Sequence, residues 1–437
     1  MIASRAVVPP PPPPPRKRIR PRVWVSVAIV VFGVLVWYGT TRVYPDWRAE
    51  RALKSAQKAS ADSDYEAARM HLTELLRIRP KSAPGHFLMV RVSWQSDDLN
   101  AARKHLREAK AAGWPREELE LEEHLIETQE TGPRGENERT LQALVLARHP
   151  TERAILEGLV KGYSKMHGQV AAVKWLGIWI ERYPDDWLPR ELRAETLGLL
   201  NLPDDARTDY RRVLELRPKN PDAHRGLGQL ELGAQRNAAA ARGHFAALLE
   251  VAPDDPAGLL GMAVCLRALG DPAGAMNFLD RLLAREPGNS RGCLENAAIR
   301  ADAGQAEEAL GWAKRAEASL PDEAELHFRL AGLFEQIGQP AAAAPHLARS
   351  DLLGEAYKKT GEWARQLLDD PSKIELRYQI GAELLRVGKD ESAVAWLSTA
   401  LLEKPDHKPS HRALASYYRK IGDARSAAEH QRIGSEK

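Results

Sequence analysis

Apolar residues recur along this chain with the spacing of amphipathic helices. In the stretch 273–283, Ala275, Leu279, Leu282 and Leu283 are three or four positions apart or adjacent, so they fall on one helical face. The same stripe returns in two other stretches, at Ala206, Tyr210, Val213 and Leu214 and at Ala393, Leu397, Ala400 and Leu401. This pattern predicts an all-α chain in which small alanines let neighbouring helices cross closely.

The alanines that begin these stripes recur with a nearly constant step. They are Ala68, Ala102, Ala172, Ala206, Ala241, Ala275, Ala309, Ala343, Ala393 and Ala427. The intervals between them are 34, 70, 34, 35, 34, 34, 34, 50 and 34 residues. A fixed period of this size indicates one unit copied many times, in which each copy stacks on its neighbours. We therefore expect a solenoid in which each repeat contacts only the repeats beside it.

Prolines and glycines divide each period into two helices. The prolines stand about twelve residues after an alanine where both are present, and they are Pro80, Pro150, Pro184, Pro218, Pro253, Pro287, Pro321, Pro371 and Pro405. The glycines stand five residues before an alanine, and they are Gly270, Gly304, Gly338, Gly388 and Gly422. Because proline ends helices and glycine suits a left-handed helix exit, each period is predicted to be helix, turn, helix.

These units resemble tetratricopeptide repeats. The small pair in the first helix is matched by Leu227–Gly228, Leu330–Ala331 and Ile380–Gly381, and the aromatic positions are matched by Tyr163, Phe334, Tyr418 and Phe245. The resemblance covers residues 49–433 and implies an alpha-alpha superhelix of about ten to eleven helix-turn-helix repeats.

Two units depart from the period. The unit over 119–150 has Glu136 and Asn137 where the alanine belongs, so we expect a degenerate repeat with its second helix shifted toward Ala143. The interval from Ala343 to Ala393 is 50 instead of 34 residues, a surplus of 16 before Pro371. Two interpretations remain open for this surplus, namely one extra helix or a lengthened second helix.

The N-terminal residues differ in composition from the repeats. Residues 1–22 carry six basic residues and no acid, a charge of +6, whereas the whole chain is +3 and the remainder is therefore −3. The excess base is confined to this tail, so the charge gives no reason to expect that the repeats bind nucleic acid. We expect residues 1–22 to be a disordered tail, in which Pro9–Pro15 forms either a polyproline spacer or a ligand for an aromatic groove.

An apolar run follows the tail. Residues 23–40 are uncharged and as one helix would measure roughly 27 Å, close to the thickness of a bilayer core. The run predicts one transmembrane helix over residues 23–41, with Trp24 at one interface and Trp37, Tyr38, Tyr44 and Trp47 at the other. The alternatives are a cleaved signal peptide, against which the Trp-Tyr-Gly-Thr-Thr-Arg ending argues, and a buried core helix.

The basic residues before this run set the expected orientation. They predict a single-pass protein of the cell (inner) membrane with a cytoplasmic N-terminus and repeats on the extracytoplasmic side. The alternative is a scaffold of inverted topology with repeats that face the cytoplasm.

Candidate chemistry is scarce. The sequence has no P-loop, no Gly-x-Ser-x-Gly and no His-Glu-x-x-His motif, so we expect no catalytic residue, no metal site and no cofactor. His407 and His411 are four residues apart, but we interpret them as residues of a solvated loop. Cys265 and Cys293 lie in the first helices of neighbouring repeats, where they are either a disulfide or two free core thiols.

The resemblance also implies a binding surface. In tetratricopeptide superhelices the first helix of each pair lines a concave groove, and this register implies a groove formed by Leu260, Val264, Leu294, Phe328, Tyr378 and Arg386. Its middle would be apolar and its C-terminal end basic, which suits an apolar or amphipathic segment. The alternative is that Phe328 and Tyr378 only pack between repeats.

Together these observations predict a non-catalytic, membrane-anchored scaffold that binds other proteins or peptides in envelope assembly or secretion. The alternative function is a recruiting subunit of an envelope enzyme complex. The repeats occupy nearly all of the chain beyond the apolar run and leave no room for a separate catalytic domain.

Overall fold

The computed structural model describes residues 21–166, 168–233 and 237–435, with only the backbone described at residues 21–28, 39 and 42. The described residues form 23 α-helices and one π-helix, and no strand occurs among them. The all-α prediction is confirmed, and the helices outnumber those of the predicted ten to eleven pairs. The predicted basic tail covers residues 1–22, and its residues 1–20, including the proline run, lie outside the described residues.

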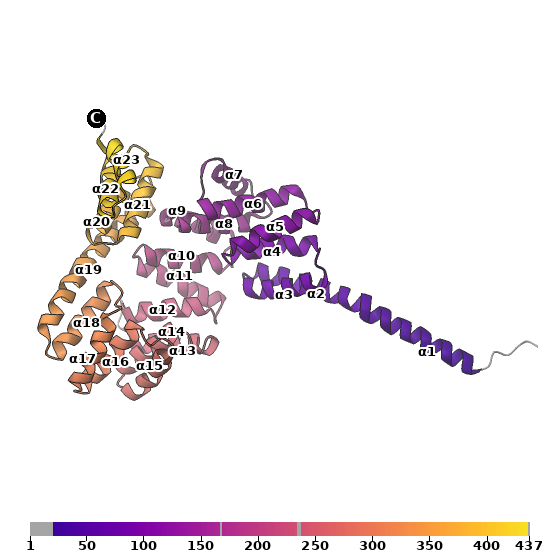
Figure 1. Cartoon of the computed structure of the whole chain (residues 1–437), viewed down its shortest axis with the longest axis horizontal. Helices are drawn as coiled ribbons and strands as arrows, with labels where there is room; N and C mark the ends of the chain where they lie inside the picture. The colour runs from indigo at the N-terminus through magenta and orange to yellow at the C-terminus, as the bar shows by residue number, and fades with distance from the viewer. Residues whose placement is uncertain (1–20, 167, 234–236, 436–437) are drawn as a thin grey trace, which may run out of the picture. The chain divides into compact units, whose positions relative to one another are not determined.

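The chain divides into two compact units, residues 1–122 and 123–437. In the first unit α1 continues through the π-helix η1 into α2 (Figure 1). α2 pairs with α3, and α4 pairs with α5. The bounds are α1 (Pro21–Tyr38), η1 (Gly39–Val43), α2 (Tyr44–Ala61), α3 (Tyr65–Ile78), α4 (Ala83–Gln95), α5 (Leu99–Ala111) and α6 (Arg116–Thr131), which crosses into the second unit.

The second unit continues the succession of helix pairs to the C-terminus (Figure 1). Its helices are α7 (Gly135–Leu146), α8 (Glu152–Lys165), α9 (Gln169–Arg182), α10 (Leu188–Leu199), α11 (Pro203–Leu216), α12 (Pro221–Gly233), α13 (Ala238–Val251), α14 (Pro256–Ala268), α15 (Pro272–Arg285), α16 (Ser290–Asp302), α17 (Ala306–Glu317), α18 (Ala324–Gln336), α19 (Pro340–Asp369), α20 (Ile374–Arg386), α21 (Asp390–Glu403), α22 (Lys408–Lys420) and α23 (Ala424–Ser435).

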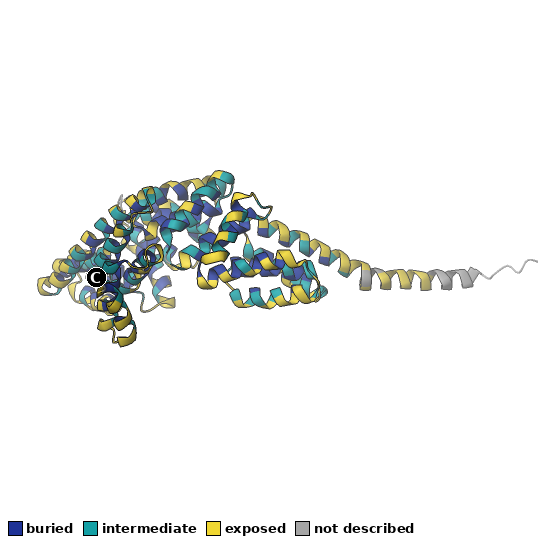
Figure 2. Cartoon of the chain, turned by 90° about the horizontal axis from the view of Figure 1, so that it is seen from above, coloured by how far each residue is buried: buried dark blue, intermediate teal, exposed yellow. Residues whose placement is uncertain are grey.

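The periodic residues do in each pair what their spacing predicts. The phased alanines are buried where the two helices cross, and Ala275 and Ala309 are fully buried. The turn glycines, such as Gly270 at φ +84°, have left-handed backbone. Asn201 at φ +59° occupies the same turn position, five residues before Ala206, because asparagine tolerates this conformation better than most residues. Buried residues consequently line the contacts between helices, and exposed ones cover their outer faces (Figure 2).

The degenerate unit is present as α6 and α7. Ala143 lies in α7, which buries Leu141 and Val145 in place of a phased alanine. At the start of this helix Asn137 donates hydrogen bonds to the carbonyl oxygen of His124 and to the hydroxyl of Thr128 on α6. α7 begins at Gly135, 34 residues before the start of α9, so this second helix is in phase with the next one. Ala143 is exposed, and the predicted shift of the helix toward Ala143 is therefore wrong.

The 16 surplus residues lengthen a second helix and do not form an extra one. α19 runs unbroken for 30 residues, with Pro345 inside it. Its C-terminal half packs back onto the turn between α10 and α11, where the side chain of Asn201 donates to the carbonyl oxygen of Tyr357 at 2.7 Å. Arg365 forms an ion pair with Asp205 at 2.7 Å. These partners are about 160 residues apart in the sequence.

An apolar cluster lies beneath this contact. Leu197, Leu200 and Leu202 from the α10–α11 region share it with Ala364 and Leu367 of α19. The prediction that each repeat contacts only its sequence neighbours is therefore wrong at this place, because the array curves until α19 meets α9, α10 and α11. Figure 1 shows α19 beside α10 and α11 in the second unit.

The helix α1 exposes its apolar side chains, as its yellow colour in Figure 2 shows. From Ile29 to Tyr38 the large apolar residues are between 46% and 68% exposed. Within the described part of the chain, no helix has both the length and the apolar content needed to cross a membrane. The side chains of residues 23–28, which belong to the predicted span over 23–41, lie outside the described set.

The two cysteines are free thiols. Cys265 and Cys293 are fully buried in α14 and α16, the first helices of neighbouring pairs. Burial raises the pKa of the Cys265 thiol to about 11. The structure therefore agrees with the interpretation as two free core thiols and not with a disulfide.

Candidate binding groove

A groove with a volume of about 950 Å³ crosses the first helices of successive pairs in the second unit. Its residues come from α12, α13, α14 and α18 and from the start of α16. The apolar part consists of Leu232, Leu260, Val264, Leu326 and Phe328. A concave surface that combines apolar side chains with a few polar groups is typical of a site for a small molecule or a peptide segment.

Phe245 of α13 supports the floor of the groove. Its ring is buried between α12 and α14, where neither Gly228 nor Gly261 has room for a side chain. A Cβ atom at Gly261 would lie 2.4 Å from this ring, and one at Gly228 would lie 2.7 Å from it. The two glycines let the helices close on the ring, and this packing fixes the positions of Leu260 and Val264 on α14.

Ion pairs hold the polar wall of the groove. The carboxylate of Glu295, fully buried on α16, lies between the guanidinium groups of Arg267 on α14 and Arg329 on α18. Burial lowers the pKa of Arg267, but Glu295 and Asp302 together raise it by more, and the net pKa lies above the ordinary value. Arg291 and Glu323 form a more exposed pair at 2.6 Å. The three arginines of this wall are thus each paired with a carboxylate.

Three of the six predicted groove residues lie together in this groove. They are Leu260 and Val264 on α14 and Phe328 on α18. The Phe328 side chain is 54% exposed, which is unusual for a phenylalanine. Leu294 is 1% exposed and belongs to the apolar core around α16 and α18, so it does not line the groove.

The other two predicted residues lie outside this groove. Tyr378 on α20 packs edge-on against the ring of His407, with ring centroids 5.7 Å apart. Arg386, at the end of the same helix, forms an ion pair with Glu383 at 2.8 Å. Tyr378 therefore makes the contact between repeats that was its alternative role, and the charge of Arg386 has a partner.

Sequence reasoning missed the charged residues of the wall. In the sequence these residues are opposite charges about one repeat apart. Arg291 pairs with Glu323, which follows it by 32 residues, and Arg329 pairs with Glu295, which precedes it by 34 residues. The same arrangement recurs at Arg225 and Asp255, which pair at 2.9 Å. Opposite charges at the repeat spacing are the signal that could have found them.

His407 lies in the turn before α22 and His411 lies within α22, and both are buried, so the interpretation as residues of a solvated loop is wrong. His407 faces Glu375 at 3.4 Å, whereas His411 bonds to His430 on the next helix. Among the described residues, no three His, Cys, Asp or Glu side chains gather as metal ligands. The two histidines therefore have different partners and do not share a site.

The stacked helix pairs and the groove across their first helices define a helical-repeat protein. Residues 193–250 and 232–292 each match a family model described as tetratricopeptide repeat. These matches include α12, α13 and α14, which form the floor of the groove. Tetratricopeptide repeats, as the sequence resemblance predicted, are therefore present in this part of the chain.

Solved structures similar to this chain include the following three. PilW, a widely conserved type IV pilus biogenesis factor, is 21% identical over 45% of this chain and 91% of its own, with a TM-score of 0.37. A tetratricopeptide repeat protein from Parabacteroides merdae is 15% identical over 65% of this chain and 98% of its own, with a TM-score of 0.40. PilF of Pseudomonas aeruginosa is 16% identical over 57% of this chain and 96% of its own, with a TM-score of 0.34. No curated protein matches the chain.

Proposed function

We propose that this protein is a membrane-anchored scaffold that holds a peptide or protein segment in the groove over α12–α18. The observation that carries the binding function is the exposed Phe328 ring beside Leu260 and Val264, above a floor that Phe245 makes rigid. Exposed aromatic anchors in preformed grooves commonly dominate the energy of peptide binding. Because the three arginines of the wall are already paired with carboxylates, the groove suits an apolar or amphipathic segment better than a strongly charged one.

The segment before the repeats supports the membrane anchor. The apolar side chains of α1 are exposed in a continuous stretch, and such a stretch requires a lipid or protein partner. The hydroxyl of Thr40 donates to the carbonyl oxygen of Val36 at 2.8 Å, and that of Thr41 to Trp37 at 2.6 Å. Hydroxyl groups that are satisfied within their own helix are compatible with a lipid environment.

Photo-crosslinking in living cells tests the binding function. A benzophenone amino acid replaces Phe328, and the matched control carries it at Leu199, which is 76% exposed on α10 outside the groove. We expect a discrete adduct from position 328 and none of the same mass from position 199. Val264→Arg should abolish the adduct, because a guanidinium would occupy the apolar part of the groove. An adduct that persists in the Val264→Arg protein would contradict binding in this groove.

Carbonate extraction of cell membranes tests the anchor separately. We expect the full-length chain to stay in the membrane pellet, because a long apolar helix binds lipid far more strongly than a peripheral charged patch. A chain that is extracted by carbonate has no membrane span, whatever its groove binds.

A further inference from the structure

Eight of the thirteen histidines form four pairs, each within one repeat. In every pair the first ring lies on the first helix and the second ring follows 19 or 20 residues later on the second helix. The Nδ1 atoms lie 3.0 Å apart in His86–His105, 3.2 Å in His224–His244, 2.8 Å in His327–His346 and 2.7 Å in His411–His430. A contact that recurs with one geometry in four repeats calls for a common explanation.

The surrounding hydrogen bonds assign the protons of these pairs. The Nε2 atom of the first ring lies 2.8 to 2.9 Å from the carbonyl oxygen of the proline six residues earlier, at Pro80, Pro218 and Pro405. A carbonyl oxygen only accepts, so Nε2 of the first ring carries the hydrogen and its Nδ1 atom has the free lone pair. The Nδ1–H of the second ring then donates to that lone pair, and both rings of the pair are neutral.

We propose that the four histidine pairs are acid-sensitive contacts. Their hydrogen bonds hold the two helices of each repeat together at neutral pH and break when protons are added. One added proton places a charge on a partly buried ring. A second places two N–H groups face to face, which removes the hydrogen bond between the helices and sets two positive charges against each other. This proposal does not depend on the groove or on the anchor.

The charges around the pair in the first unit favour its neutral form. Burial in the first place, together with the neighbouring His86 and Lys104, lowers the pKa of His105 to about 4. Glu108 and Asp98 act in the opposite direction but more weakly. The His105 ring therefore stays neutral well below pH 6.5.

The pair between α12 and α13 has the same balance. Burial and then the neighbouring His224 lower the pKa of His244. Of the two charged groups that face it, Glu231 raises this pKa and Arg211 of α11 lowers it. Neither outweighs the burial of the ring.

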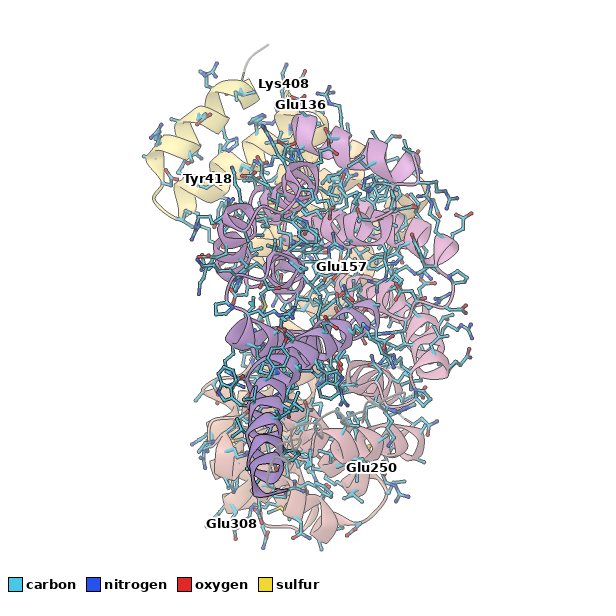
Figure 3. The ribbon with its side chains drawn as sticks, turned by 90° about the vertical axis from the view of Figure 1, so that its right-hand side faces the viewer. Glu136, Glu157, Glu250, Glu308, Lys408 and Tyr418 are labelled. Atoms are coloured by element: carbon cyan, nitrogen blue, oxygen red, sulfur yellow. The ribbon has the colours of Figure 1, made fainter. Side chains whose placement is uncertain are left out.

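The pair between α22 and α23 is the third neutral one. Burial and then His411 lower the pKa of His430, which Glu429 raises by less. The ring of Tyr418, labelled in Figure 3, stacks on His430 with centroids 5.5 Å apart and limits its contact with water.

The pair between α18 and α19 differs because acids stand at both of its ends. His327 faces Asp322 at 3.2 Å, and His346 faces Glu317 at 3.3 Å. Burial lowers the pKa of His327, and His346 and Arg349 lower it as well, whereas the hydrogen bond with Asp322 raises it. Because carboxylates face both of its rings, we do not expect this pair to respond to acid as the other three do.

The sign of the effect follows from these pKa values. Histidines in the unfolded chain have a pKa of about 6.5, so between that pH and the lower folded value the unfolded chain binds more protons. The contribution of the pairs to stability is thus complete above pH 6.5 and declines as the pH falls below it, and for His105 this decline extends to about pH 4. For His105 we expect the opening equilibrium to rise roughly five- to tenfold from pH 7.5 to 5.0, since partial exposure screens part of the shift.

Hydrogen exchange of the full-length chain in detergent micelles tests this proposal at pH 7.5 and 5.0, with exchange times scaled for the intrinsic rates. We expect protection to fall in α5, α13 and α23 but to change little in α15 and α17, whose pairs contain no histidine. The triple variant His105→Asn, His244→Asn, His430→Asn retains a donor toward the first ring and removes the second titrating ring. It should lose most of this dependence on pH.

The matched control is His71→Asn on α3, because His71 belongs to none of the four pairs. This variant should keep the full response of the wild-type chain. Equal loss of protection in the pairs with and without histidine would overturn the proposal, as would a triple variant that retains the whole response. If the triple variant fails to fold, the wild-type comparison between α13 and α15 decides the question by itself.

Discussion

At the scale of single residues, exposure separates binding positions from packing positions on the same helical face. Leu294 and Phe328 were both placed in the groove by their position in the first helix of a repeat. The structure buries Leu294 to 1% exposure and leaves Phe328 54% exposed. Spacing along a helix defines the direction of a side chain but not how far the next repeat covers it. The two residues should therefore respond differently to the same truncation.

We expect Leu294→Ala to lower the free energy of unfolding by roughly 2 to 5 kcal/mol, because it leaves a cavity in a packed core. Phe328→Ala should cost roughly 1 kcal/mol or less, because its ring is largely in solvent already. Urea denaturation of both variants measures the difference, and wild-type protein gives the reference slope. A larger loss for Phe328→Ala than for Leu294→Ala would mean that Phe328 is a core residue.

At the scale of elements, the long helix α19 changes the array more than any other departure from the period. Its N-terminal half is an ordinary second helix, in which Arg349 binds Asp322 and also donates to the carbonyl oxygen of Val387 at 2.7 Å. The hydrogen bond from Arg349, and after it the one from Lys389, hold the pKa of the Asp322 carboxyl well below its usual range. The C-terminal half then reaches the α10–α11 turn, so one element joins distant parts of the second unit.

A designed disulfide tests this contact between α19 and the α10–α11 turn. A Cβ atom at Gly361 would lie 3.7 Å from the Cβ atom of Asn201, within the roughly 3.5 to 4.5 Å that disulfides need. The double variant Asn201→Cys, Gly361→Cys should therefore oxidise readily, which electrophoresis under non-reducing conditions detects. Cys265 and Cys293 are buried and should not compete.

The matched control pairs Gly361→Cys with Leu199→Cys, since Leu199 lies near the same turn and is 76% exposed. It should oxidise much more slowly. The left-handed backbone at residue 201 costs a cysteine there roughly 1 kcal/mol, so the expressed protein should remain folded. Equal rates of oxidation in the two double variants would count against the closed contact.

The sequence determines the helix pairs more fully than it determines their curvature. Alanine, glycine and proline act within one repeat, so their spacing predicted the helices and the turns. The groove positions Leu260, Val264 and Phe328 came from the resemblance to tetratricopeptide repeats. The choice between an extra helix and a lengthened one stayed open because helical periodicity is the same in both. The contact of Asn201 with Tyr357 depends on small rotations summed over several repeats, which no local pattern encodes.

At the scale of the whole molecule, charge is distributed unevenly about the apolar run. Residues 1–22 carry +6, and the rest of the chain carries −3. Basic residues that flank a membrane span are retained on the cytoplasmic side, whereas acidic residues have little influence. If α1 is the proposed anchor, this asymmetry places the repeats and their groove on the extracytoplasmic side. The histidine pairs would then meet the pH of that compartment and not that of the cytoplasm.

A reporter fusion tests this orientation. Alkaline phosphatase folds only outside the cytoplasm, so its fusion after Lys437 should be active in cells. The variant replaces the five basic residues nearest the apolar run by neutral ones, namely Arg16, Lys17, Arg18, Arg20 and Arg22. It should lower the phosphatase activity, because the charge of residues 1–22 falls from +6 to +1 and no longer retains this tail in the cytoplasm. Replacement of Lys54 and Lys58, two exposed cations on the far side of the run, is the matched control and should leave the activity unchanged. An inactive fusion that is expressed at full length would place the repeats in the cytoplasm and reverse the proposed topology.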